Sequence, residues 1–194
     1  MTMSEQALNS RRPKRADARR NYDKVLGAAR AAFAEQGTNA SLEEIARRAG
    51  VGIGTLYRHF GTRQDLLEAV YLDEVEALCQ SAEDFADLPP WEALVSWLNR
   101  FVSYVSTKRA LAEELAATVG METEVFKKCH DAIFSAGEPL LERAQAARAV
   151  RSDAAFGDVI RLVSGVTMIK GAKPEDIERI LAMALDGLRY TPPA

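Results

Sequence analysis

The chain has 194 residues, of which 25 are Lys or Arg and 28 are Asp or Glu, so its formal net charge is −3. Hydrophobic residues make up 47% of it, a proportion typical of ordinary globular proteins and well above that of disordered chains. The slight acidity argues against a uniformly basic nucleic-acid coat. Cys79 and Cys129 show no CxxC or Cys/His ligand spacing, so we expect no disulfide framework, metal site or cofactor.

Neither a membrane span nor a secretion signal is predicted. No stretch approaches the roughly 18 consecutive apolar residues that a spanning helix needs. The arginines near the N-terminus are not followed by the apolar segment of a signal peptide. We therefore expect a cytoplasmic protein without a membrane partner.

The average charge conceals a division along the chain. Residues 1–63 hold 12 Lys or Arg and 6 Asp or Glu, a net of +6, whereas residues 64–194 hold 13 and 22, a net of −9. Such asymmetry indicates a nucleic-acid-binding segment joined to a body with another role, although chance clustering also produces it. Residues 1–16 lack apolar periodicity and are rich in arginine, which predicts a disordered basic arm that either neutralises DNA phosphates or only solubilises the chain.

From Asp17 onward the apolar residues recur at a helical period, and no alternating β-type run competes with it. The pattern predicts an all-α fold of about nine helices. We expect one domain of three helices over residues 17–63 and a larger helical domain over residues 64–194.

The three predicted helices of residues 17–63 are short and sharply punctuated. The first carries one apolar stripe over residues 22–33 and stops at Gly37. The second begins at a capping box formed by Ser41 and Glu44 and stops at Gly50. The third follows directly and has an apolar stripe at offsets 0, 3, 4 and 7, which consists of Ile53, Leu56, Tyr57 and Phe60. A helix, a glycine turn and a second short helix form a helix-turn-helix.

The other face of the third helix carries hydrogen-bond donors. Thr55, Arg58 and His59 lie on it, and Arg63 follows just beyond. An ordinary three-helix core with a solvated polar face would look similar. The positive charge of the segment and its glycine turn favour contact with DNA.

The stretch from Ser41 to Phe60, with Thr-Leu-Tyr-Arg-His-Phe after an Ala-Gly-Val turn, resembles the DNA-binding region of the TetR-like transcriptional regulators. The resemblance covers about residues 18–70. It departs at Gly61, where many members carry a lysine, so one phosphate contact is missing unless the basic arm replaces it. The DNA contacts that the resemblance implies fall on Thr38, Ser41, Gly52, Ile53, Gly54, Thr55, Tyr57, Arg58, His59 and Arg63.

Aromatic residues gather in two predicted helices of the acidic body, over about residues 91–105 and 122–148. Aromatic rings with a few polar groups line small-molecule pockets between helices, and they equally make ordinary helical cores. The resemblance implies an effector chamber here but assigns no residues to it. From periodicity, the candidate effector-binding residues are Trp97, Phe101, Tyr104, Phe126, His130 and Phe134.

The last two predicted helices, over residues 153–169 and 174–188, have broad apolar faces. These faces either close the core of one chain or, as the resemblance implies, pair with the same helices of a second subunit. A two-fold dimer would place two recognition helices in major grooves about 34 Å apart, which predicts a palindromic operator. The candidate dimerisation residues are Phe156, Val159, Val163, Val166, Ile177, Ile180, Leu181, Ala184, Leu185 and Leu188.

The function that these features predict is that of a homodimeric transcriptional repressor. Its partners would be double-stranded operator DNA, a small-molecule effector that releases it, and a second copy of itself. A constitutive DNA-binding dimer without an effector is the alternative, followed by a small-molecule-binding protein or an enzyme. An enzyme is disfavoured because no Ser/His/Asp set or Gly-rich phosphate loop is present, and the neighbouring Cys129 and His130 would point about 100° apart on a helix.

Overall fold

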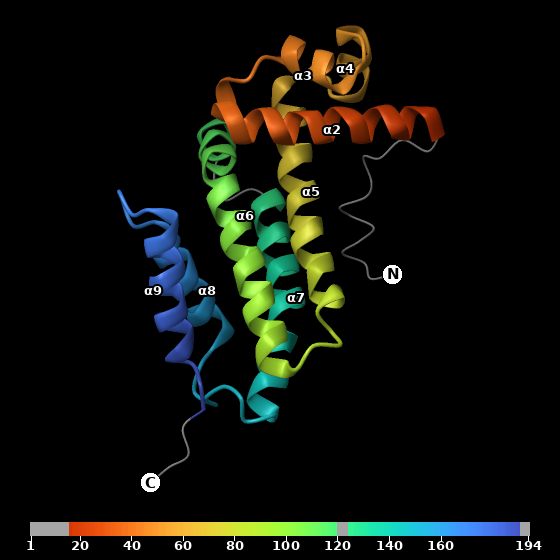
Figure 1. The fold of residues 1–194 in the computed structure, drawn as a ribbon. Coiled ribbons are helices and arrows are strands. Elements are labelled where there is room, and N and C mark those ends of the chain that lie inside the picture. Colours follow the sequence, from red (N-terminus) through yellow and green to blue (C-terminus); the bar gives the residue numbers. More distant parts are fainter. Residues whose placement is uncertain (1–15, 120–123, 191–194) are drawn as a thin grey trace. The chain divides into compact units, whose positions relative to one another are not determined.

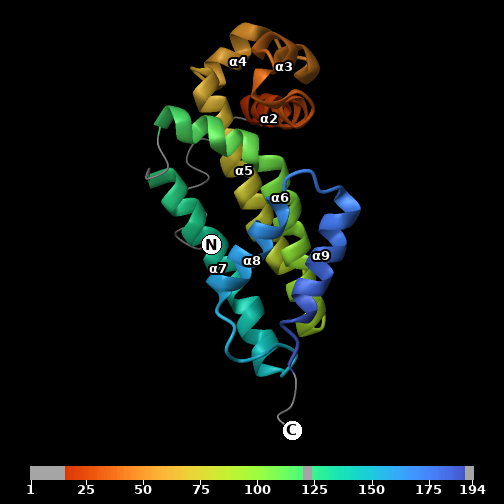
Figure 2. The ribbon, with the colours of Figure 1, turned by 90° about the vertical axis from the view of Figure 1, so that its left-hand side faces the viewer.

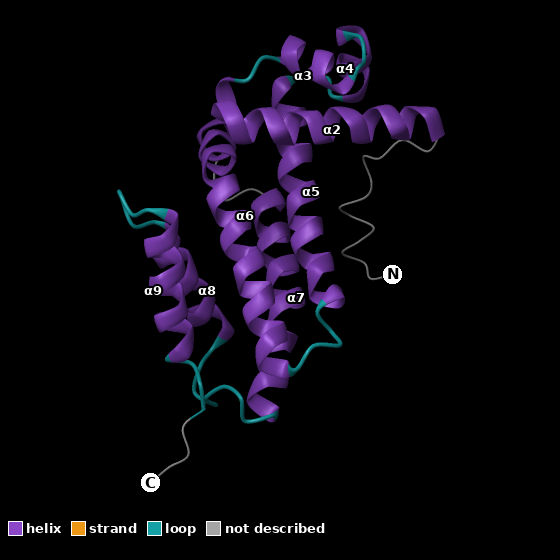
Figure 3. Cartoon of the chain, viewed as in Figure 1, coloured by secondary structure: helices purple, strands orange, loops and turns teal. Residues whose placement is uncertain are grey.

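The computed structural model describes residues 16–119 and 124–190, apart from the side chains of residues 38, 106–119, 124 and 174. The described part contains eight α-helices and one 3₁₀ turn joined by loops, and no strand (Figure 3). This confirms the predicted all-α class. The predicted basic arm lies outside the described residues, except for Ala16, which begins the first helix, α2.

The chain divides into two compact units. One comprises the residues up to Glu76 together with Thr107–Lys127, and the other comprises Ala77–Ser106 together with the residues from Lys128 onward. Three helices contribute residues to both units: α5 (Arg63–Asp84), α6 (Pro90–Val119) and α7 (Glu124–Ala146). The domain boundary predicted at Arg63 falls at the start of α5, whereas the two units divide between Glu76 and Ala77.

The first unit is built on α2 (Ala16–Gln36), which packs against α3 (Leu42–Ala49) and α4 (Ile53–His59), as Figure 1 shows. The stripe predicted over residues 22–33 is buried at every position. Ile45 of α3, Leu56 of α4 and Leu66 of α5 are completely buried in the same unit. Each helix therefore contributes one apolar line to a common core.

Two glycines end helices as the sequence predicts. Gly37 follows α2, opens the 3₁₀ turn η2 (Gly37–Asn39) and has a φ of 62°. Gly50 has a φ of 67°, and its amide donates to the carbonyls of Ala46 and Arg47 at the end of α3. Side chains disfavour this left-handed conformation, so glycine is the residue that closes both helices at low cost.

The second unit contains α8 (Phe156–Thr167) and α9 (Pro174–Asp186), which lie side by side in Figures 1 and 2. The segments beyond α7 and α9 are joined by an isolated antiparallel bridge between Val150 and Arg189. The Arg151 amide donates to the Leu188 carbonyl at 2.9 Å. These backbone bonds tie the end of the described chain to the α7–α8 connection.

An aromatic cluster fills the centre of this unit. Trp97 is completely buried, its indole N–H donates to the Leu78 carbonyl at 3.2 Å, and its ring stacks on Phe101 with centroids 5.9 Å apart. A Cβ atom on Gly137 would lie 2.3 Å from Cζ of Phe156 and 2.5 Å from Cη2 of Trp97. The two rings therefore reach the backbone of α7 only because residue 137 is a glycine.

None of the helices in residues 16–119 and 124–190 is long and apolar enough to cross a membrane.

Candidate nucleic-acid interface

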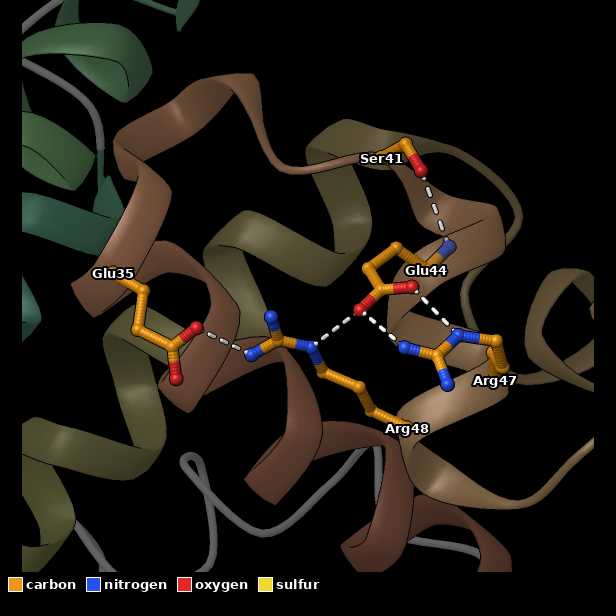
Figure 4. Close-up of polar contacts among 5 residues, drawn as sticks. All are labelled: Glu35, Ser41, Glu44, Arg47 and Arg48. Atoms are coloured by element: carbon orange, nitrogen blue, oxygen red, sulfur yellow. Dashed lines mark hydrogen bonds and ion pairs between the residues drawn. The ribbon is translucent and has the colours of Figure 1, made fainter.

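Helix α3 begins at a side-chain cap. The Ser41 hydroxyl accepts a hydrogen bond from the Glu44 amide at 3.1 Å, which satisfies one of the free N–H groups of the first turn. The reciprocal half of the predicted capping box does not form. The Glu44 carboxylate turns away from Ser41 because two arginines of α3 attract it (Figure 4).

Glu44 is the centre of a charged network that joins α3 to α2 (Figure 4). Its carboxylate accepts two bonds from Arg47 and one from Arg48, each at 2.8 Å, and Arg48 also donates to Glu35 of α2 at 2.7 Å. Hydrogen bonds from Arg47 and then Arg48 lower the pKa of Glu44 to about 2. The network holds α3 in place on α2 and occupies both arginines.

Replacing Glu44 with glutamine should lower the melting temperature by an amount that depends on pH. The pKa of Glu44 in the folded chain lies below its ordinary value of 4.5, so the ionised carboxylate contributes stability above about pH 4.5, and this contribution disappears as the pH falls towards 2. Thermal unfolding of both proteins between pH 7 and pH 3 should show their difference shrinking with acidity. Glu43→Gln, an exposed neighbour, is the matched control. A difference that is the same at pH 7 and pH 3 would refute the role of the network.

Helix α4 presents large apolar side chains to solvent. Leu56 and Phe60 are buried, but Ile53 is 38% exposed and Tyr57 is 46% exposed. The prediction that all four form one inward stripe is therefore wrong for Ile53 and Tyr57. Leu56 and Phe60 lie along one edge of the stripe, and Ile53 and Tyr57 lie along the other edge. Only the first edge of this short helix packs against the rest of the chain.

Arg58 lies along the surface of the same helix. Its Nε donates to the Gly54 carbonyl at 3.2 Å and its Nη2 donates to the Thr55 hydroxyl at 3.0 Å. His59, the next residue, contacts the edge of the buried Tyr22 ring at 6.1 Å between centroids. Burial and then the charge of Arg58 lower the pKa of His59 below its ordinary value.

The two glycines at the start of α4 are not required by packing within the chain. A Cβ atom on Gly52 or Gly54 would meet nothing within 4 Å. In a helix interior, glycine costs about 1 kcal/mol relative to alanine. Gly54, inside α4, therefore leaves the start of the helix uncovered without any gain to the fold, whereas Gly52 is the N-cap, where glycine is well tolerated.

Arg63 has structural contacts besides its predicted contact with DNA. Its Nη1 donates to the Ala40 carbonyl at 2.7 Å, and its guanidinium lies 5.7 Å from the centre of the Phe33 ring. Arg63 thus holds the start of α5 against the segment between α2 and α3.

Arg30 of α2 pairs with Asp73 and Glu74 of α5. Local sequence patterns do not predict this contact, because Arg30 and Asp73 are 43 positions apart in the sequence.

Most of the predicted DNA contacts lie together. Ser41 is exposed at the start of α3, Arg63 begins α5, and the side chain of Thr38 in η2 lies outside the described residues. The remaining seven are on α4 or at its N-cap, and they are Gly52, Ile53, Gly54, Thr55, Tyr57, Arg58 and His59.

The candidate effector residues have unequal surroundings. Trp97 and Phe101 are buried, whereas Tyr104 and Phe134 are half-buried. The side chain of His130 is 65% exposed and stacks on Phe134 with centroids 4.2 Å apart. Phe126 belongs to the first unit, where it meets the edge of the Tyr71 ring. Five of the six candidates therefore lie in the second unit, and they range from core to surface.

The candidate dimerisation residues are mostly inside the chain. Ile177, Ile180 and Ala184 are half-buried. The exposed large apolar residues on these helices and just beyond α8 are not among the candidates: Leu162, Met168, Ile169 and Met183. The candidates buried within the single chain are Phe156, Val159, Val163, Val166, Leu181, Leu185 and Leu188.

In the described part of the chain, no group of three or more His, Cys, Asp or Glu side chains is placed to hold a metal ion.

Two protein-family models match the chain. Residues 25–70 match "Bacterial regulatory proteins, tetR family", and residues 89–190 match "Transcriptional regulator SbtR-like, C-terminal domain". The first match contains the described α3 and α4, and the second begins just before α6.

Known proteins resemble the chain over both units. A TetR transcriptional regulator of Streptomyces coelicolor is 42% identical, with a TM-score of 0.76 over 88% of this chain and 99% of its own. A TetR transcription regulatory protein of Mycobacterium vanbaalenii is 34% identical, with a TM-score of 0.73 over 91% of this chain and 99% of its own. An HTH-type transcriptional regulator of Staphylococcus aureus (strain USA300) is 43% identical over 53 residues, which are 27% of this chain and 29% of that relative.

Proposed function

The chain belongs to the TetR family of transcriptional regulators, and we propose on this basis that it is a homodimeric repressor of a palindromic operator. A small-molecule effector that binds the second unit would release it from DNA. Such a protein acts where the DNA is, in the cytoplasm, and has no catalytic role.

The observation that supports operator binding most strongly is the exposed face of α4. Ile53 and Tyr57 are large and apolar yet turned to solvent, and Arg58 lies beside them. Monomeric folds gain nothing by exposing such a set on a short helix. A helix with apolar and arginine side chains on its free face suits the major groove, where it meets thymine methyl groups and base-edge acceptors.

Dimerisation would bring two such helices to one operator. We propose that the partner covers the exposed apolar residues of α8 and α9, of which Leu162 is 41% and Met183 is 69% exposed. The half-buried Ile177, Ile180 and Ala184 would extend this surface. Their buried neighbours on the same helices form the core against which the surface is held.

An effector would act by binding two conformations of the dimer unequally. Release of operator by a factor of 100 requires about 2.7 kcal/mol of coupling free energy, which the differential contacts of one site can supply. The half-buried rings of Tyr104 and Phe134 offer apolar surface for such a ligand.

A constitutive DNA-binding dimer is the second candidate function, and one observation favours it. The rings of Trp97 and Phe156 lie so close to the backbone of α7 that a Cβ atom on Gly137 has no room, and His130 turns outward. The two rings thus fill this part of the second unit as side chains fill a packed core. If no compound in a panel of apolar small molecules lowers operator affinity, the constitutive function would be preferred.

The proposed operator binding predicts a defined result in sequence selection. Full-length protein incubated with random duplexes at low and moderate salt should enrich a palindrome whose half-site centres are about 10 base pairs apart, because a two-fold dimer repeats its contacts at one helical turn. Its affinity should fall steeply with salt, because phosphate contacts release counterions. If no sequence is enriched over random duplex at either salt concentration, the proposed function is wrong.

A further inference from the structure

We propose that Arg58 reads a guanine in each half-site of the operator and that Thr55 is the positioning residue that orients it. The inference rests on the proposed operator binding and adds to it the identity of one base. It follows from the way in which the guanidinium of Arg58 is held on α4.

One side of the Arg58 guanidinium is already occupied. The N–H of Nε and the N–H of Nη2 that lies next to it point in the same direction from the planar group. Nε donates to the Gly54 carbonyl at 3.2 Å and Nη2 donates to the Thr55 hydroxyl at 3.0 Å. Both acceptors belong to α4 itself, so the guanidinium is fixed by its own helix.

The far edge of the guanidinium remains available. It consists of one N–H of Nη1 and the second N–H of Nη2, which are parallel and equally spaced donors. Among the four bases, guanine alone offers two neighbouring acceptors, O6 and N7, in the major groove, whereas adenine pairs its N7 with a donor. The free edge of Arg58 therefore matches guanine and no other base.

The position of the guanidinium favours a base over a phosphate. Arg58 lies near the end of α4, but its side chain runs back to Gly54 and Thr55 in the first turn of the helix. Recognition helices contact base edges through their N-terminal residues. Nothing within the chain approaches the position of a Cβ atom on Gly54, so the groove floor can come close to the guanidinium there.

Arg58 is also free of carboxylates, unlike the arginines of α3. Arg47 and Arg48 are bound by Glu44, and Arg48 by Glu35 as well. Arg58 is exposed and makes no ion pair with any carboxylate in the described part of the chain. Its charge is available for DNA, and the two bonds to α4 reduce the rotamer freedom that binding must remove.

The test compares base preferences of full-length variants on selected duplexes. For the wild-type protein, replacing one guanine of a half-site should lower affinity between about 5- and 150-fold. Arg58→Ala should bind all four bases equally at that position and keep its preferences elsewhere. Arg47→Ala, an exposed arginine bound to Glu44, is the matched control and should keep the guanine preference.

Two variants isolate the role of Thr55. Thr55→Val keeps the branched shape and loses the acceptor, so the guanine preference should fall several-fold, whereas Thr55→Ser should retain it. Circular dichroism and thermal unfolding establish that each variant is folded.

Three outcomes would overturn parts of the inference. If Arg58→Ala lowers affinity for every duplex by the same factor and reduces the salt slope by about one while all base preferences persist, Arg58 contacts a phosphate and not a base. A guanine preference unchanged in Thr55→Val would remove the positioning role. A wild-type protein without any sequence preference would instead overturn the proposed function itself.

Discussion

Replacement of Trp97 by alanine is expected to lower the free energy of unfolding by about 3–5 kcal/mol, the cost of removing a large aromatic side chain from a packed core. The ring is completely buried between Phe101 and Phe156, and its N–H is bonded to the Leu78 carbonyl. Alanine would leave a cavity, and the Leu78 carbonyl would lose the indole bond and keep its bond from the Ser81 hydroxyl. Chemical denaturation followed by circular dichroism measures the loss.

The chain supplies a matched control for this prediction in its other tryptophan. Trp91 lies on the same helix but is half-buried, and its ring is covered by the Arg189 guanidinium at 4.1 Å. Trp91→Ala should therefore cost clearly less than Trp97→Ala, since it removes less buried surface. Equal costs for the two variants would mean that Trp97 is not part of a packed core and would favour an effector chamber at this place.

A protein carrying both Leu162→Asp and Met183→Asp is expected to be monomeric and to bind operator far more weakly than the wild type. In the proposed dimer, both positions face the partner, and burying an unpaired carboxylate at an interface costs several kcal/mol. Two copies of each change add to this cost. Sedimentation measures the oligomeric state, and titration of a selected operator measures affinity.

Leu88→Asp is the control for the double variant. Leu88 is a large exposed apolar residue that lies between α5 and α6, away from α8 and α9 in the sequence. It should leave both the oligomeric state and operator affinity unchanged. A double variant that remains dimeric would refute the proposed interface on α8 and α9.

The helix-turn-helix is predictable from the sequence because its signals are local. Gly37 and Gly50 take up the left-handed conformation that ends their helices, and Ser41 caps α3. Each signal depends on backbone geometry within four residues. Such signals therefore do not depend on how the rest of the chain folds.

The direction in which apolar residues face is less predictable from the sequence than the helix-turn-helix. Periodicity places Ile53 and Tyr57 with Leu56, yet only Leu56 of the three is buried, because a short helix has little surface against its neighbours. The same holds on α8, where Val163 is buried and Leu162 is exposed. A repeat of apolar residues indicates an apolar face but not whether the chain itself or a partner covers it.

Contacts between distant segments could not be predicted from the sequence either. The pairing of Arg30 with Asp73 and Glu74 joins residues more than forty positions apart, and nothing local marks it. Gly137 likewise lacks a local reason, since its role depends on rings that come from α6 and α8. Both depend on tertiary packing, which overrides the preferences of single residues.

The account as a whole depends on sequence-specific binding of DNA through α4. The most direct test is the ratio of two dissociation constants of the full-length protein, one for a selected palindrome and one for random duplex, at the same salt concentration. We predict a ratio of about 1,000 or more, as specific DNA-binding proteins show, with two protomers on each palindrome and a strong reduction of the ratio in Arg58→Ala. A ratio near one would contradict the account.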